Sequence, residues 1–172
     1  MRRAGRVDAV IHAAGVHSFT IPGRTDRQFE RIFATNVEAP IALTSDLLAS
    51  GSLVDGSVIV FLSSAAAVIG SRMTSVYSAS KSAVLGYARG LAADLAPRRI
   101  RVLSVLPGLV ETPMGTRILD QTGDAGSGLR QQHPLGIGRP EDIAGVIAFL
   151  CSPRAKWMTG TEIAVDGGYS LR

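Results

Sequence analysis

Tyr77 and Lys81 are the two residues whose types and spacing point most directly to chemistry. Four positions apart, they would share one face of a helix. A phenol with a pKa near ~10 is a poor acid or base at neutral pH, and a cation held beside it stabilises its charged form. Three tyrosines and two lysines in the chain make such a pair rare by accident. The pair therefore indicates acid–base catalysis, and the alternative is an ordinary surface contact.

Hydroxyl groups lie where they could join this pair. The continuous apolar run over 58–62 predicts a strand buried on both faces, and Ser63 and Ser64 follow it directly. The carboxyl ends of parallel strands border the crevice in which α/β sheets bind ligands. Ser64 precedes Tyr77 by thirteen residues, so we expect both side chains at that crevice.

The elements that must position these residues alternate along the chain. Short apolar runs and longer amphipathic runs are typical of helices packed on a mostly parallel sheet. Strands are predicted over 7–14, 58–62, 100–106 and 162–165, and helices from near Thr25 to Leu48, over 76–95 and from Pro140. Pro40 should bend the first helix because it lacks a backbone donor. With no repeat and no linker, the chain reads as one domain over residues 1–172.

The segment 113–138 shows weak helical periodicity and many glycine and polar residues. We therefore expect a mobile loop or lid there, with Leu119, Leu129 and Leu135 supplying some apolar lining to a pocket. The stretch 122–128 resembles a phosphate-binding glycine motif, but it follows no apolar strand. A flexible glycine-rich loop is the preferred interpretation.

Composition excludes several classes of protein. The 172 residues carry a net charge of +4 and one cysteine, so they hold neither a disulfide framework nor a four-ligand zinc site, and we expect no metal. The apolar run over 65–69 and the other apolar runs of the chain are too short to span a bilayer. Arginines are scattered among carboxylates without interleaved aromatics, which argues against a nucleic-acid partner. Met1-Arg2-Arg3 leads directly towards a strand-like segment, so we expect no cleavable signal and a cytoplasmic domain.

Taken in order, these motifs resemble the short-chain dehydrogenase/reductase family over essentially the whole chain. His12-Ala13-Ala14-Gly15 is similar to the family's Asn-Asn-Ala-Gly segment, and Asn36 to its helix asparagine. Ser64 corresponds to the catalytic serine, and Tyr77 and Lys81 to the Tyr-x-x-x-Lys pair. The other matches are Pro107-Gly108-Leu109-Val110-Glu111-Thr112, Gly138-Arg139-Pro140-Glu141-Asp142-Ile143 and Val165-Asp166-Gly167-Gly168.

The resemblance implies hydride transfer between NAD or NADP and a small-molecule carbonyl/alcohol pair. It implies that Tyr77 is the general acid for reduction, that Lys81 lowers the pKa of Tyr77 and binds the nicotinamide ribose, and that Ser64 donates to the substrate oxygen. Asn36 would hold a water that links Lys81 to solvent. The implied catalytic residues are Asn36, Ser64, Tyr77 and Lys81, and the implied cofactor-binding residues are Ala14, Gly15, Tyr77, Lys81, Pro107, Gly108, Val110 and Thr112.

The sequence also departs from the family pattern. His12 replaces an asparagine, and we interpret it as a satisfied strand-end histidine rather than a catalytic group. The strand at 7–14 corresponds to the family's fourth, so the expected fold is a partial Rossmann-like doubly wound parallel sheet. It would have about four strands with flanking helices and would lack the first three family strands with their glycine-rich turn. The unpaired edge of that strand would favour pairing with another chain.

Two hypotheses about function follow. The first is an NAD(P)-dependent oxidoreductase. The second is a non-catalytic or incomplete relative that acts as a partner-binding module. In the family, the helices near 26–50 and 76–96 form the usual oligomer interface, and the small residues Ala79, Ser82 and Ala83 would permit close packing. We therefore expect a homo-oligomer.

Overall fold

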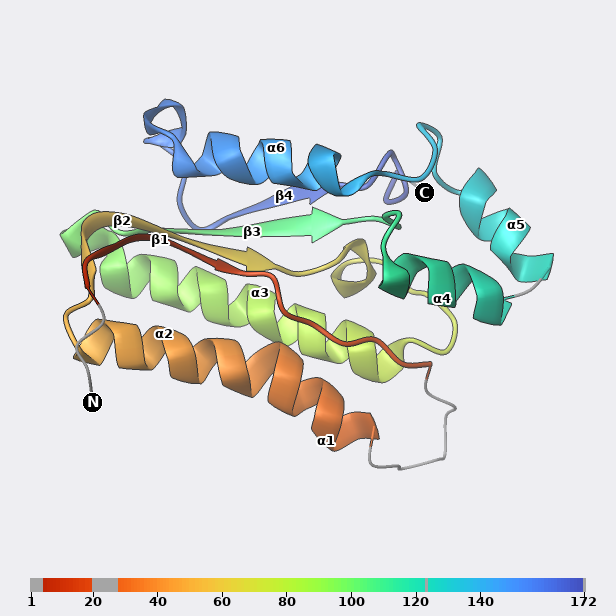
Figure 1. Cartoon of the computed structure of the whole chain (residues 1–172), viewed down its shortest axis with the longest axis horizontal. Helices are drawn as coiled ribbons and strands as arrows, with labels where there is room; N and C mark the ends of the chain where they lie inside the picture. Colours follow the sequence, from red (N-terminus) through yellow and green to blue (C-terminus); the bar gives the residue numbers. More distant parts are fainter. Residues whose placement is uncertain (1–4, 20–27, 123, 172) are drawn as a thin grey trace.

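The centre of the computed structural model is a parallel sheet of four strands in the order β1-β2-β3-β4 (Figure 1). The structure describes residues 5–19, 28–122 and 124–171. The strands are β1 (Val7–His12), β2 (Leu53–Leu62), β3 (Arg101–Pro107) and β4 (Thr161–Val165). The α/β class and the parallel sheet of about four strands expected from the sequence are confirmed.

Helices cover both faces of this sheet. The N-terminal helical segments α1 (Gln28–Phe33), η1 (Ala34–Glu38) and α2 (Ala39–Ala49) lie with α3 (Ser75–Leu95) on one face, and α6 (Pro140–Cys151) lies on the other (Figure 1). Thr25, the expected start of the first helix, lies outside the described residues. No helix in the ranges that the structure describes is long and apolar enough to cross a membrane.

Successive side chains of β2 point to opposite faces of the sheet, so this one strand contributes to two hydrophobic cores. Ile59 and Phe61 pack with Val84, Ala88 and other residues of α3. Their neighbours Val58 and Val60 point to the opposite face and belong to the core beneath α6, with Ile143 and Leu150. A parallel strand buried on both faces needs apolar residues at successive positions, which explains the continuous run in the sequence. The two cores hold α3 and α6 in place on either side of the strand ends.

Strand β1 is the edge of the sheet within the described part of the chain. It pairs with β2 in parallel, and the side chain of Ile11 remains 41% exposed. The strand ends at His12, whose Nε2 lies 2.8 Å from the Thr44 hydroxyl. Since that hydroxyl donates its proton to the Pro40 carbonyl, it accepts from His12, and Nε2 is the donor. The imidazole also stacks on Phe61 at 4.7 Å. His12 is thus a satisfied strand-end histidine, as expected.

The mobile loop expected over 113–138 is wrong for most of its length. The structure forms α4 (Pro113–Thr122) and α5 (Asp124–Gln131) there. The hydroxyl of Thr112 accepts from the Gly115 amide over 3.1 Å and so caps the first turn of α4. The two helices stand beyond the carboxyl ends of the strands (Figure 1). The stretch 122–128, interpreted as a flexible glycine-rich loop, is likewise helical on both sides of residue 123.

Candidate active site

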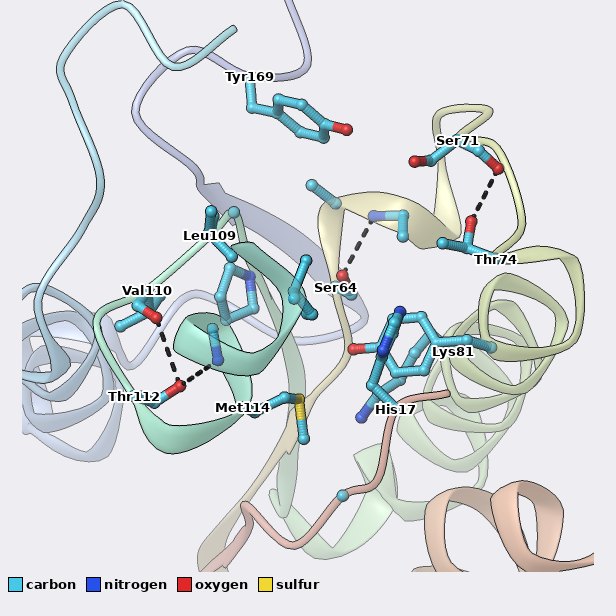
Figure 2. Close-up of a pocket in the computed structure, with 18 of the residues that line it drawn as sticks. His17, Ser64, Ser71, Thr74, Lys81, Leu109, Val110, Thr112, Met114 and Tyr169 are labelled. Carbon is cyan, nitrogen blue, oxygen red and sulfur yellow. Dashed lines mark hydrogen bonds between the residues drawn. The ribbon is translucent and has the colours of Figure 1, made fainter. Parts of the chain in front are cut away.

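A cavity of about 780 Å³ opens at the carboxyl ends of the strands. Leu109, Val110 and Thr112 lie on one side of it, Lys81 and His17 lie on the other, and Ser64 lies between them (Figure 2). The cavity gathers most of the predicted site residues, namely Gly15, Ser64, Tyr77, Lys81, Pro107, Gly108, Val110 and Thr112. Two predicted residues are absent from its lining: Asn36 lies behind it, and Ala13 takes the place of Ala14.

Tyr77 lies one helical turn before Lys81 on α3 and is partly buried in the wall of the cavity. Burial raises the pKa of Tyr77, and a side-chain hydrogen bond with Ser64 opposes this rise without cancelling it. Desolvation of the phenolate dominates the pKa of Tyr77 in this structure, and the lowering expected from Lys81 stays a prediction. The phenol is protonated at neutral pH, which suits a group that must donate a proton.

The backbone conformation of Ser64 orients its side chain. It is the extended residue that precedes the short helix η2 (Ala65–Ala67), and its Oγ accepts from the Ala66 amide over 3.2 Å. Accepting this bond leaves the hydroxyl proton free to donate. The side chain thus aims its donor at the Tyr77 side of the cavity.

Lys81 is buried, with 5% of its surface exposed. Its Nζ donates to the carbonyl oxygen of Leu62, the last residue of β2, over 2.8 Å. Burial lowers the pKa of Lys81 to about 8, because desolvation disfavours the ammonium. The Nζ lies 5.9 Å from the centre of the Tyr77 ring. At pH 7 the side chain is therefore a cation beside the phenol.

Asn36 joins three segments behind the cavity. Its Oδ1 accepts from the Val16 amide over 2.8 Å, and its Nδ2 donates to the Val16 carbonyl and to the Ser80 hydroxyl, each over 3.0 Å. A Cβ added to Gly15 would lie 3.3 Å from the Nζ of Lys81 and 3.5 Å from the Oδ1 of Asn36. A side chain at position 15 would therefore crowd both the lysine ammonium and the asparagine amide, and glycine avoids this.

The bend expected at Pro40 takes the form of a π-helical turn, η1, that contains Asn36. The amide of Ala39 donates to the Ala34 carbonyl, five residues back, instead of four. Proline has no amide proton, so the Asn36 carbonyl lacks the donor that an α-helix would supply from position 40. Single π-turns of this kind are frequent at functional sites.

The segment 107–112 forms the wall opposite Lys81. The Gly108 amide donates to the Val165 carbonyl, and the Leu109 carbonyl accepts from the Gly138 amide over 3.0 Å. A Cβ on Gly108 would lie 2.8 Å from the Asp166 carbonyl oxygen, so only glycine allows this approach. A Cβ on Gly115 would lie 2.0 Å from the Val110 carbonyl oxygen. Because both residues are glycines, the wall packs directly against Asp166 on one side and against α4 on the other.

The turn that follows β4, residues 165–168, packs against the wall formed by 107–112. The Asp166 carboxylate accepts from the amides of Gly168 and Ser170 over 3.0 and 2.9 Å. Burial raises the pKa of Asp166, but these hydrogen bonds and one from the Ser170 side chain lower it overall. Gly167 and Gly168 have φ angles of 60° and 87°, which allow the tight turn. Asp166 is thus a turn-forming residue.

The cavity residues that sequence reasoning missed include His17, His133 and Tyr169. The His17 ring packs edge-on against Tyr77 at 4.8 Å, and burial lowers the pKa of His17. His133 stacks on Tyr169 at 4.4 Å. Neither histidine belongs to a local spacing pattern, because the chain brings their partners from distant positions. Of the three leucines expected to line the pocket, Leu129 does so. Leu119 is absent from the lining, and Leu135 is 87% exposed.

Comparison with known proteins gives a consistent answer. Residues 1–170 match the family profile described as "Enoyl-(Acyl carrier protein) reductase". An uncharacterized oxidoreductase of Methylorubrum extorquens is 39% identical over 171 residues, with 98% of this chain and 68% of that protein covered. The human "Dehydrogenase/reductase SDR family member 2, mitochondrial" is 37% identical over 175 residues, and the chain covers 61% of it.

Solved structures show the same similarity in three dimensions. The angucycline C-6 ketoreductase LanV with bound NADP has a TM-score of 0.88 and 31% identity, over 97% of this chain and 64% of that one. A blue fluorescent protein from a metagenomic library, in complex with NADPH, has a TM-score of 0.86 and 35% identity. That comparison covers 95% of this chain and 65% of the other.

The buried Lys81 makes a prediction about stability. Its pKa falls from the ordinary 10.5 to about 8 on folding, so the unfolded chain binds more protons between these values. The free energy of unfolding should therefore gain about 3 kcal/mol from this group as the pH rises from 8 to 10.5. Lys81→Met should lose that gain, and Lys156→Met at an exposed position should keep it. Urea unfolding at several pH values measures the difference, and parallel curves for wild type and Lys81→Met would contradict the assignment.

Proposed function

The chain belongs to the short-chain dehydrogenase/reductase family of oxidoreductases, and we propose that it transfers a hydride between NAD(P) and a carbonyl/alcohol pair. The observation that carries the proposal is the meeting of Ser64, Tyr77 and Lys81 in one cavity at the carboxyl ends of the strands. A general acid, a hydroxyl donor and a cation are the groups that carbonyl reduction requires.

Each residue has a proposed task in the direction of reduction. Tyr77 donates its proton to the oxygen of the substrate as negative charge develops there. Ser64 donates a hydrogen bond to the same oxygen, which stabilises that charge. The Lys81 ammonium lowers the energy of the phenolate that is left. The raised pKa of Tyr77 supports this direction, because the phenol enters the reaction protonated.

Asn36 is proposed to pass protons between Lys81 and solvent through a water molecule. Support comes from the meeting of the asparagine amide and the lysine Nζ beside Gly15, and from the Asn36 carbonyl that Pro40 leaves without its helical donor. The amide group itself is engaged with Val16 and Ser80. The water is therefore proposed to bind the backbone carbonyl.

Either NAD or NADP is the proposed cofactor, and it supplies the hydride when bound. Its nicotinamide end is proposed to lie between Gly15, Lys81 and the wall formed by 107–112, on the side of the cavity where a Cβ on Gly15 would crowd the Lys81 ammonium. Ala14 is proposed to contribute through the backbone next to Gly15. The chain spans 68% and 61% of the two relatives named above, so the activity of a longer protein is part of the proposal.

The proposed substrate is a carbonyl compound with an apolar body. Around the polar group at Ser64 and Tyr77, the cavity is lined by apolar side chains from α4, α5 and α6, namely Met114, Ile118, Leu129, Ile143 and Ile147. Such a lining favours apolar substrates by burying their surface.

Tyr77→Phe tests the proposal. It should lower kcat by at least about 10²-fold, since general acid catalysis of this kind contributes 10²–10⁴-fold. The dissociation constants of NADH and NADPH, measured by fluorescence titration, should change little. Tyr87→Phe on the same helix is the matched control and should keep full activity. Full activity of Tyr77→Phe would overturn the assignment, and a wild-type chain that binds neither cofactor would favour the partner-binding alternative.

The proposed assembly is a homo-oligomer through the helices near 26–50 and 76–96. Phe29 and Leu43 on this layer are each 50% exposed, and an apolar partner surface would bury them. Leu43→Glu should convert the oligomer into monomers in light-scattering chromatography. Leu135→Glu, at a leucine that is exposed elsewhere, should leave the mass unchanged. A wild-type monomer at micromolar concentration would contradict this interface.

The proposed compartment is the cytoplasm, where thiols stay reduced. The single cysteine, Cys151, is a free and partly buried thiol on α6. Cell fractionation followed by immunodetection should recover the protein with cytoplasmic markers. Recovery with an oxidising compartment would contradict the proposal.

A further inference from the structure

His133 is a buried polar residue of the cavity to which the proposed reaction gives no task. Only 4% of its surface is exposed, and it follows α5 at the point where the chain turns back toward α6. It contacts three segments that are far apart in sequence: α5, the wall formed by 107–112, and the C-terminal turn. A residue so placed can couple the positions of all three.

The hydrogen bonds of His133 fix its protonation. The Leu109 amide donates to Nε2 over 3.0 Å, so Nε2 carries a lone pair. The Nδ1 atom lies 2.9 Å from the Leu129 carbonyl oxygen, which can only accept. The imidazole is therefore neutral, with its proton on Nδ1. The other contact is the parallel stack on Tyr169, with ring centres 4.4 Å apart.

Through this bond His133 holds the backbone of the wall. The Leu109 amide is fixed by Nε2, and the carbonyl of the same residue is fixed by the Gly138 amide. Next to it, the hydroxyl of Thr112 donates to the Val110 carbonyl, as Figure 2 shows. Without the imidazole acceptor, the Leu109 amide would be a partly buried donor with no partner, and the wall would turn to satisfy it.

We propose that His133 is a positioning residue for the nicotinamide end of the cofactor, which it orders by accepting the Leu109 amide on Nε2. The inference rests on the proposed function for the identity of the ligand. It predicts that the acceptor atom of His133, rather than the bulk or the stacking of its ring, sets the affinity for NADH or NADPH.

Two variants separate the acceptor from the ring. His133→Phe keeps an aromatic ring that can stack on Tyr169 but has no acceptor. His133→Gln loses the stack but keeps an oxygen at a reach similar to that of Nε2. His133→Phe should raise the KM of the preferred cofactor about tenfold, with kcat at saturation changed less than about threefold. His133→Gln should restore most of the affinity. Equal losses in both variants, or a loss confined to kcat, would overturn the proposal.

A second measurement needs neither activity nor cofactor. Amide hydrogen exchange at Leu109, measured by NMR, should be about tenfold faster in His133→Phe than in wild type and nearly normal in His133→Gln. In wild type, the ¹⁵N shifts of the imidazole should show the proton on Nδ1. Unchanged exchange in folded His133→Phe would overturn the inference, and a proton on Nε2 in wild type would overturn it even if His133→Phe failed to fold. A wild type that binds neither NADH nor NADPH would instead overturn the proposed function, and the Leu109 exchange would still decide whether His133 orders the wall.

Discussion

A reciprocal pair of hydrogen bonds joins α3 to the end of β2, and the arrangement of the site depends on it. The ammonium of Lys81 donates to the Leu62 carbonyl, and the hydroxyl of Ser63 donates to the Lys81 carbonyl over 2.9 Å. These bonds fix the rotation of α3 against the strand, so Tyr77, one turn earlier, must face the cavity. Because Ser64 follows Ser63 directly, the same contact brings the second hydroxyl within reach of the phenol. The helix–strand contact thus positions the groups that are proposed to react.

The parts of this arrangement that depend on neighbours in sequence could be predicted. The Tyr77–Lys81 spacing is a property of one helix, and the run over 58–62 marks a strand buried on both faces. The helices over 113–131 were missed because glycine and polar residues weaken their periodicity, while capping by Thr112 supports them. His133 was missed because its partner, Leu109, lies 24 residues away and depends on those helices. Long-range contacts of this kind leave no spacing in the sequence.

Pro40 shows how a local irregularity serves the site. Its effect on the helix could be predicted as a bend, since proline removes a donor. The form of the irregularity could not be predicted, because it depends on contacts with distant segments. The helix has a π-turn instead of a kink, and this turn places the Asn36 amide against Val16 and Ser80. These contacts hold the strand end that carries Gly15 next to α3. An irregular helical turn therefore connects the first strand of the sheet to the helix that carries Tyr77.

Burial changes the pKa values of Tyr77 and Lys81 in opposite directions, and this has a consequence for the proposed reaction. Desolvation raises the pKa of the phenol and lowers that of the ammonium to about 8. After Tyr77 gives its proton to a substrate, the Lys81 ammonium is the stronger acid of the two, so proton transfer from Lys81 to the phenolate is favourable. In the proposed relay, the neutral amine would then regain a proton from solvent on the side of Asn36. Burial therefore favours the return of Tyr77 to its protonated state, the form in which it would begin carbonyl reduction.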